Sequence, residues 1–177
     1  MNRVFTVLIA ACLALPCVAG EPAFTRSTID LGCVVGDLDA SVRFYTEGIG
    51  FQELKGFEVP APLATDAGLT DGKPLAIRVL VLGSGESATK LKLMQVAGTT
   101  PRTGDTEFIH SRAGFRYLTI FVADTDAALA RLAKVGVKPV AKSPVALPAS
   151  LAPAGMHLTC VRDPDGNLVE LIGPRTK

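Results

Sequence analysis

Apolar and polar positions in this chain mostly alternate over short runs, as in strands, and change to a helical spacing at two places. The first β-rich run covers residues 29–35 and leads to Asp37, whose side chain suits the N-cap of a helix. A helix is predicted over 38–47, ended by Gly48. Apolar positions that share one face of this helix are Leu38, Val42 and Tyr45. Strands are predicted next, at 50–58, 75–83 and 89–95.

The same pattern then occurs a second time. Residues 117–129 align with residues 30–42 without a gap, because both are a strand that runs into an Asp-x-Asp-Ala helix start. The second helix is expected to end near Gly136. Further elements are a strand at 137–141, a Pro- and Ala-rich loop at 143–155, and strands at 156–162 and 167–172 joined by an Asp-Pro-Asp-Gly-Asn turn.

This repeat predicts an α+β domain made of two tandem βαβββ modules. The modules cover 28–96 and 114–173, joined by a linker at 97–113, and together form one domain over 28–173. Two half-open sheets of this kind can share a cavity between them.

Residues 1–20 have a different character. One basic residue precedes a short apolar run, and small residues follow this run. This pattern is typical of a secretory signal peptide. We therefore expect a secreted protein, periplasmic if the source is Gram-negative, with no membrane association after cleavage. Whether Cys17 carries a lipid stays open.

Composition excludes other classes of function. The formal net charge is +1, tryptophan is absent and 6% of the residues are aromatic, which argues against a nucleic-acid partner. The 48% of hydrophobic residues is enough for a folded core. Cys33 and Cys160 remain after signal cleavage, either as two buried thiols, the interpretation we favour, or as a disulfide.

The repeated segments resemble the vicinal oxygen chelate superfamily, which includes glyoxalase I, extradiol dioxygenases and bleomycin-resistance proteins. The resemblance is carried by 37–45 and 48–51 in the first module and by 124–128 and 162–171 in the second. It implies curved, mixed sheets that form a shared cup, with the helices outside. It also implies four inward-facing positions, on the first and last strands of each module, that usually hold a divalent metal through histidine and glutamate. The residues at these positions here are Asp30, Lys92, Tyr117 and Glu170.

Only Glu170 is a usual ligand of the family. Tyr117 is a weak ligand at neutral pH, and Lys92 has no lone pair to offer while its charge repels a divalent ion. The ammonium of Lys92 would then replace the metal as the positive centre of the cup. Two alternatives stay open: an ion pair without a function, and a register error of one residue that turns these side chains to the other face.

Three functions follow from the resemblance. The first is a small organic ligand bound in the cup without metal or turnover. The second is a lyase or isomerase in which Glu170 or Asp30 acts as base and Lys92 stabilises an oxyanion. The third is a metal-dependent enzyme, including a dioxygenase, that uses Glu170 and Asp30. We expect no cofactor; the third function alone would require a divalent metal. The sequence does not identify the ligand. A homodimer stays open.

Weaker candidates are treated as ordinary residues. Arg78 and Arg116 lie near cup strands and could meet an anion, but a solvated surface role is expected of each. His110 and His157 are isolated in the sequence. The loop at 59–74 is long enough to cover the cup or to be a plain surface excursion.

Overall fold

The computed structural model describes residues 24, 26–102 and 104–176. The predicted signal peptide therefore lies outside the described residues. Among the helices of the described part, none is both long and apolar enough to cross a membrane.

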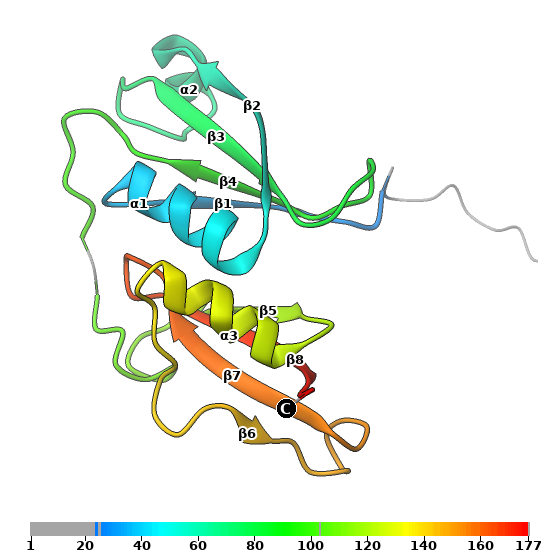
Figure 1. The fold of residues 1–177 in the computed structure, drawn as a ribbon. Helices are drawn as coiled ribbons and strands as arrows, with labels where there is room; N and C mark the ends of the chain where they lie inside the picture. Colours follow the sequence, from blue (N-terminus) through cyan, green and yellow to red (C-terminus); the bar gives the residue numbers. More distant parts are fainter. Residues whose placement is uncertain (1–23, 25, 103, 177) are drawn as a thin grey trace, which may run out of the picture.

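Two βαβββ modules make up the fold, as the repeat predicts (Figure 1). The first contains β1 (Asp30–Val34), α1 (Leu38–Arg43), the π-helix η1 (Phe44–Ile49), β2 (Gln52–Val59), α2 (Ala61–Asp66), β3 (Leu75–Val81) and β4 (Lys90–Met94). The second contains β5 (Tyr117–Phe121), α3 (Thr125–Lys134), β6 (Val145–Ala146), β7 (Met156–Arg162) and β8 (Leu168–Pro174).

The two sheets have equivalent topologies. Their strand orders are β1-β4-β3-β2 and β5-β8-β7-β6. In each, the first strand pairs in parallel with the last, and the remaining pairs are antiparallel. The predicted equivalence of β1 with β5 and of β4 with β8 is confirmed.

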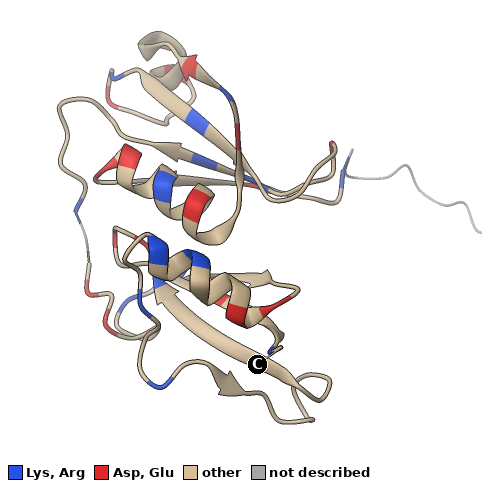
Figure 2. Cartoon of the chain, in the orientation of Figure 1, with Lys and Arg blue, Asp and Glu red and all other residues tan. Residues whose placement is uncertain are grey.

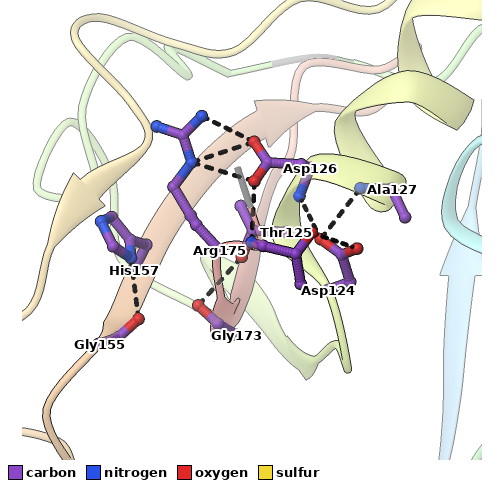
Figure 3. A network of polar contacts seen from close by, with 9 residues as sticks. Asp124, Thr125, Asp126, Ala127, Gly155, His157, Gly173 and Arg175 are labelled. Carbon is purple, nitrogen blue, oxygen red and sulfur yellow. Dashed lines mark hydrogen bonds and ion pairs between the residues drawn. The ribbon is translucent and has the colours of Figure 1, made fainter.

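Both helices begin where the sequence predicts. The side chain of Asp37 accepts a hydrogen bond from the backbone N–H of Ala40, and that of Asp124 accepts from Asp126 and Ala127. The C-terminal segment reinforces the second start: Thr176 donates to Asp124, and Arg175 forms an ion pair with Asp126 at 2.7 Å (Figure 3). Thr125 donates to the carbonyl of Gly173, so β8 and α3 are held together at their ends.

The boundaries of three elements differ from the prediction. The first helix changes to a π-helix at Phe44 and continues to Ile49, where Gly50 with a φ of 111° ends it. The loop at 59–74 contains α2, a helix of six residues. The strand expected at 137–141 is not formed; the edge strand is β6, inside the predicted loop 143–155.

The core lies between the sheets and the helices and includes both modules. Leu91 and Leu93 of β4, Val169 and Leu171 of β8 and the helical residues Tyr45 and Leu132 belong to one buried cluster. The helices η1 and α3 pack against each other, and both lie on the same side of the two sheets (Figure 1). The opposite faces of the sheets, with Lys92 and Glu170, are thus the ones left for a cup.

A β-bulge in β2 keeps its apolar side chains on the cup face. Leu54 lies opposite Val79 and Phe57 opposite Ile77, with the irregularity between them at Lys55 and Gly56. A Cβ added at Gly56 would overlap the carbonyl oxygen of Ile77. Only glycine therefore lets the bulged strand approach β3 this closely.

Gly56→Ala is expected to lower the free energy of unfolding by about 1–3 kcal/mol, because β2 must move away from β3. Urea unfolding followed by circular dichroism measures this. The matched control is Gly32→Ala on β1, where an added Cβ would meet only the methyl of Met94 at 3.6 Å. Equal stability of the two variants would contradict the role given to Gly56.

Candidate functional site

The edge strands β1 and β5 of the two sheets border a cavity of about 480 Å³. Its lining comes mostly from residues 29–33 and 115–118, together with Tyr45, Leu91, Asn167 and Leu168. Apolar and aromatic side chains dominate this lining, and Phe115 is fully exposed while Tyr117 is half-exposed. Such a surface can hold an apolar molecule with few polar groups.

A second cavity, of about 430 Å³, lies elsewhere, beside the loop that follows α2. It is lined by residues 68–71, Lys73, Val96 and Thr99. None of the four residues predicted for the site lines it. Asp30 and Tyr117 line the cavity between β1 and β5, whereas Lys92 and Glu170 are not among its lining residues. The cavity between β1 and β5 is therefore the candidate site.

Asp30 and Lys92 form an ion pair on the cup face of the first sheet. The ammonium nitrogen of Lys92 lies 2.9 Å from Oδ2 of Asp30, and it also lies over the ring of Phe57, 5.9 Å from the ring centroid. Arg26 reaches the same carboxylate oxygen at 3.1 Å. The hydrogen bond from Lys92 is the main reason that the pKa of Asp30 lies below its ordinary value.

The other oxygen of this carboxylate has no such partner. Oδ1 of Asp30 is buried and accepts no hydrogen bond from the described residues, although Asp30 lines the cavity. A buried carboxylate oxygen without a donor is costly, and such an atom in a folded protein requires an explanation.

Tyr117 and Glu170 occupy the equivalent strands of the second module. Tyr117 lines the same cavity as Asp30. Glu170 accepts a hydrogen bond from the hydroxyl of Thr119 at 2.8 Å and lies opposite Cys160 on β7. The structure thus gives an Asp30–Lys92 pair, a Thr119–Glu170 pair, and a cavity shared by Asp30 and Tyr117.

The weaker candidates have structural roles. Arg78 donates to Glu53 and to Asp39 of α1, so it lies on the helix face and not in the cup. Arg116 lines the cavity but donates to the carbonyls of Phe108 and Ile109 in the linker.

Neither histidine belongs to the cavity lining given above. His110 stacks on Phe108, and Nδ1 of His157 lies 3.0 Å from the carbonyl oxygen of Gly155 (Figure 3). Cys33 and Cys160 are free thiols. Burial is the main reason that the pKa of Cys33 rises to about 11, so this thiol is unreactive at neutral pH.

A polar contact between the modules was not predicted. The Tyr45 hydroxyl, on η1, donates to Oδ2 of Asp163 at 3.0 Å, and Asp163 also accepts from the backbone N–H groups of Asp165 and Asn167 and from the Asn167 side chain. Asp165 accepts from the backbone N–H of Gly36 at 2.8 Å. We call this group (Gly36, Tyr45, Asp163, Asp165 and Asn167) the intermodule clasp. It fixes the β7–β8 turn on the first module, next to the cavity residues Cys33 and Tyr45.

Comparison with known proteins agrees with this architecture. The family model of the glyoxalase/bleomycin resistance protein/dioxygenase superfamily matches residues 30–171. This chain belongs to that superfamily. A search of curated proteins finds no match.

Several solved structures of glyoxalase-superfamily proteins share the fold. A glyoxalase family protein from Bacillus cereus is 20% identical, with a TM-score of 0.67, covering 88% of this chain and 98% of that one. The trypanothione-dependent glyoxalase I of Leishmania major is 25% identical, with a TM-score of 0.57, covering 84% and 87%. A superfamily domain from Frankia sp. is 20% identical, with a TM-score of 0.57, covering 88% and 94%.

Lys92→Met is expected to lower the free energy of unfolding by about 1–2 kcal/mol, because Asp30 then keeps only Arg26 as an ionic partner. The lowered pKa of Asp30 stabilises the folded state above the ordinary carboxyl pKa, and this contribution is lost as the pH falls through the lowered value. The difference between wild type and variant should therefore shrink on acidification. Urea unfolding at pH 7 and pH 3 measures it, with Lys90→Met on the same strand as the control; an unchanged difference would contradict the pairing.

Proposed function

We propose that this protein is an exported member of the superfamily that binds a small organic ligand between β1 and β5, without a metal ion. The cavity of about 480 Å³ between the edge strands β1 and β5 is the observation that carries the proposal. Its volume suits a small molecule, and its apolar lining favours one with a hydrophobic body.

The side chains at the four positions that usually hold the metal in this family support binding of the ligand without a metal ion. A divalent ion needs lone pairs, and here the four residues supply two carboxylates, a phenol and an ammonium. Lys92 lies 2.9 Å from the Asp30 carboxylate, so an ion beside Asp30 would be repelled by Lys92 and by Arg26. Among the described residues, no group of three or more His, Cys, Asp or Glu side chains is placed to hold a metal. The donor set therefore does not fit the divalent ion usual in the family.

Export is part of the same proposal. The basic start and short apolar run within residues 1–20 support it. The mature chain should begin near Gly20 or Glu21, which N-terminal sequencing of protein from the extracytoplasmic fraction tests. An intact Met1 on a cytoplasmic protein would overturn this part.

Elemental analysis of the purified mature protein, with native mass spectrometry for co-purifying organic molecules, tests the binding mode. We expect less than 0.1 metal ion per chain and a bound or exchangeable organic ligand. A Lys92→Glu variant returns an oxygen donor beside Asp30 and is expected to bind Mn²⁺ more tightly than wild type. Stoichiometric metal in the wild type, or turnover of a ligand that is lost in Glu170→Gln, would replace the proposal with an enzymatic function.

A further inference from the structure

We infer that the cavity between β1 and β5 takes an extended peptide segment, which pairs as an added strand with the free edges of both sheets. This inference rests on the proposed function, since it names the class of ligand for the same cavity. Two observations carry it: an unpaired strand edge lies on each side of the cavity, and neither edge has the features that usually protect one.

The strands β1 and β5 each present one unpaired edge to the cavity. They are the terminal strands of different sheets, and no backbone hydrogen bond joins them among the described residues. Almost all of their Cα atoms lie more than 8 Å apart. Paired strands lie about 4.8 Å apart, so a strand inserted between two others separates those two by about 10 Å. The cavity of about 480 Å³ therefore suits a single inserted strand.

Hydrogen bonds just beyond the two strands show which backbone groups face the cavity. The N–H of Val35 donates to the last residue of β4. Because successive residues of a strand point alternately to its two edges, the N–H and C=O of Gly32 point away from β4. Likewise, the N–H of Val122 donates to β8, so the backbone groups of Tyr117 point away from β8. Gly32 is exposed, Tyr117 is half-exposed and both line the cavity, so each edge offers a donor and an acceptor to a peptide main chain.

The outer edges of the same two sheets are protected, whereas the inner edges are not. The outer strand β2 has three charged residues and a β-bulge, and β6 has two residues and follows Pro144. Charges, bulges, prolines and short length are the usual means that prevent an edge from adding a strand. In contrast, β1 and β5 have five residues each, no proline and one charged side chain, Asp30. Gly32 in the middle of β1 is also typical of a position that another backbone approaches closely.

The two sides of the cavity favour different side chains in the peptide. The side toward the core is apolar and consists of Leu31, Cys33, Leu91 and Leu118. On the cup side lies Asp30, paired with Lys92. Since the side chains of a strand alternate between its two faces, the favoured segment alternates apolar with polar residues.

The peptide acetyl-Thr-Val-Thr-Val-Thr-amide tests the inference, because it has the length of β1 and alternates valine with threonine. An analogue that is N-methylated at its second and third residues keeps the side chains but loses one N–H toward each edge. NMR titrations of the mature protein give each Kd and, through the amide shifts, the place of binding. We expect shifts in β1 and β5, and binding of the analogue that is weaker by about tenfold or more, as for the loss of two hydrogen bonds.

Variants at Gly32 assign the binding to the edge of β1. Gly32→Pro removes the N–H, and proline is tolerated where the N–H of an edge strand points away from its neighbour. We expect it to weaken peptide binding by about fivefold or more. Gly32→Ala is the matched control, because it keeps the N–H and its Cβ would meet only Met94, at 3.6 Å. Its Kd should stay within about twofold of the wild type.

Hydrogen exchange gives a second measurement that needs no variant. The amide protons of Gly32 and Tyr117 should exchange with solvent more slowly in the peptide complex, because they then donate to the peptide. Circular dichroism checks that Gly32→Pro is folded. If it is not, exchange in the wild type and the comparison with the N-methylated analogue decide.

Equal Kd values for the peptide and its N-methylated analogue overturn the inference, as do amide shifts confined to β2 or β6 and unaltered exchange at Gly32 and Tyr117. A second probe, 2-naphthol, has no peptide group and separates this failure from failure of the proposed function. If 2-naphthol shifts amides of β1 and β5 but the peptide does not, the inference is overturned and the proposed function stands. If neither probe shifts them, both fail.

Discussion

Asp163→Ala should lower the free energy of unfolding by about 3 kcal/mol or more. The Asp163 carboxylate is 5% exposed and accepts hydrogen bonds from Tyr45, Asp165 and Asn167. Truncation leaves these donors without a partner at the junction of the modules, and each buried, unsatisfied donor costs about 1–3 kcal/mol. Urea unfolding at pH 7 measures the loss.

The control for this variant is Asp105→Ala, which removes an exposed carboxylate that accepts one backbone N–H from Glu107. Its effect should stay within about 0.5 kcal/mol. If Asp163→Ala were equally mild, water would replace the lost acceptor and the clasp would not hold the modules.

The pH dependence of the same site has a definite sign. Burial is the main cause that raises the pKa of Asp163 above its ordinary value, so the folded protein takes up this proton more readily than the unfolded chain. Its titration therefore favours the fold at low pH, and the favourable contribution is lost as the pH rises through the raised pKa. Relative to Asp163→Asn, the wild type should gain stability on acidification. A difference that is constant from pH 7 to pH 3 would contradict this.

Leu132→Ala is the second large effect and should cost about 2–5 kcal/mol, as for other fully buried leucines. Leu132 of α3 is 0% exposed and lies against Gly48 of η1, where an added Cβ would be 3.2 Å from its Cδ2. The cavity left by truncation would lie between the modules. We expect both modules to unfold in one transition in this variant, at a lower urea concentration.

Leu151→Ala is the matched control, because this leucine is 74% exposed in the loop before β7. Its unfolding midpoint should equal that of the wild type. Two separate transitions in Leu132→Ala would show that the modules are independent, contrary to the shared core.

The elements with strong local signals were predictable from the sequence. Asp37 and Asp124 mark both helix starts because a carboxylate that caps a helix acts on N–H groups two or three residues away. Asp30 and Tyr117, the first residues of β1 and β5, were singled out through the family resemblance and not through a local signal.

Other features depend on tertiary contacts and left no local signal. Val137 packs against the core without belonging to a strand, and the backbone N–H of Val140 donates to Cys160, which explains why residues 137–141 resembled a strand. The hydrophobic pattern of β3 does not show which of its faces points into the cup, because residues on both faces are buried. Tyr45 was predicted as an apolar residue of the helix face, and nothing nearby in the sequence indicates that its hydroxyl meets Asp163.

Acidic and basic side chains are interspersed over both modules (Figure 2), which agrees with the balanced composition. The distribution of charged residues along the sequence therefore does not indicate where the site lies. The ion pair of Lys92 with Asp30 could be predicted from the sequence, because the family resemblance places both residues at inward-facing positions. The burial of Oδ1 of Asp30, by contrast, is indicated by no local sequence pattern.

The intermodule clasp has a consequence for synthesis on the ribosome. Gly36 and Tyr45 donate hydrogen bonds to Asp165 and Asp163, which lie 129 and 118 residues later in the chain. While the first module leaves the exit tunnel, Tyr45 and Phe44 have no α3 to cover them, and the polar groups of the first helix have no β7–β8 turn. The amino-terminal half must therefore remain incompletely folded until β7 and β8 have been synthesised.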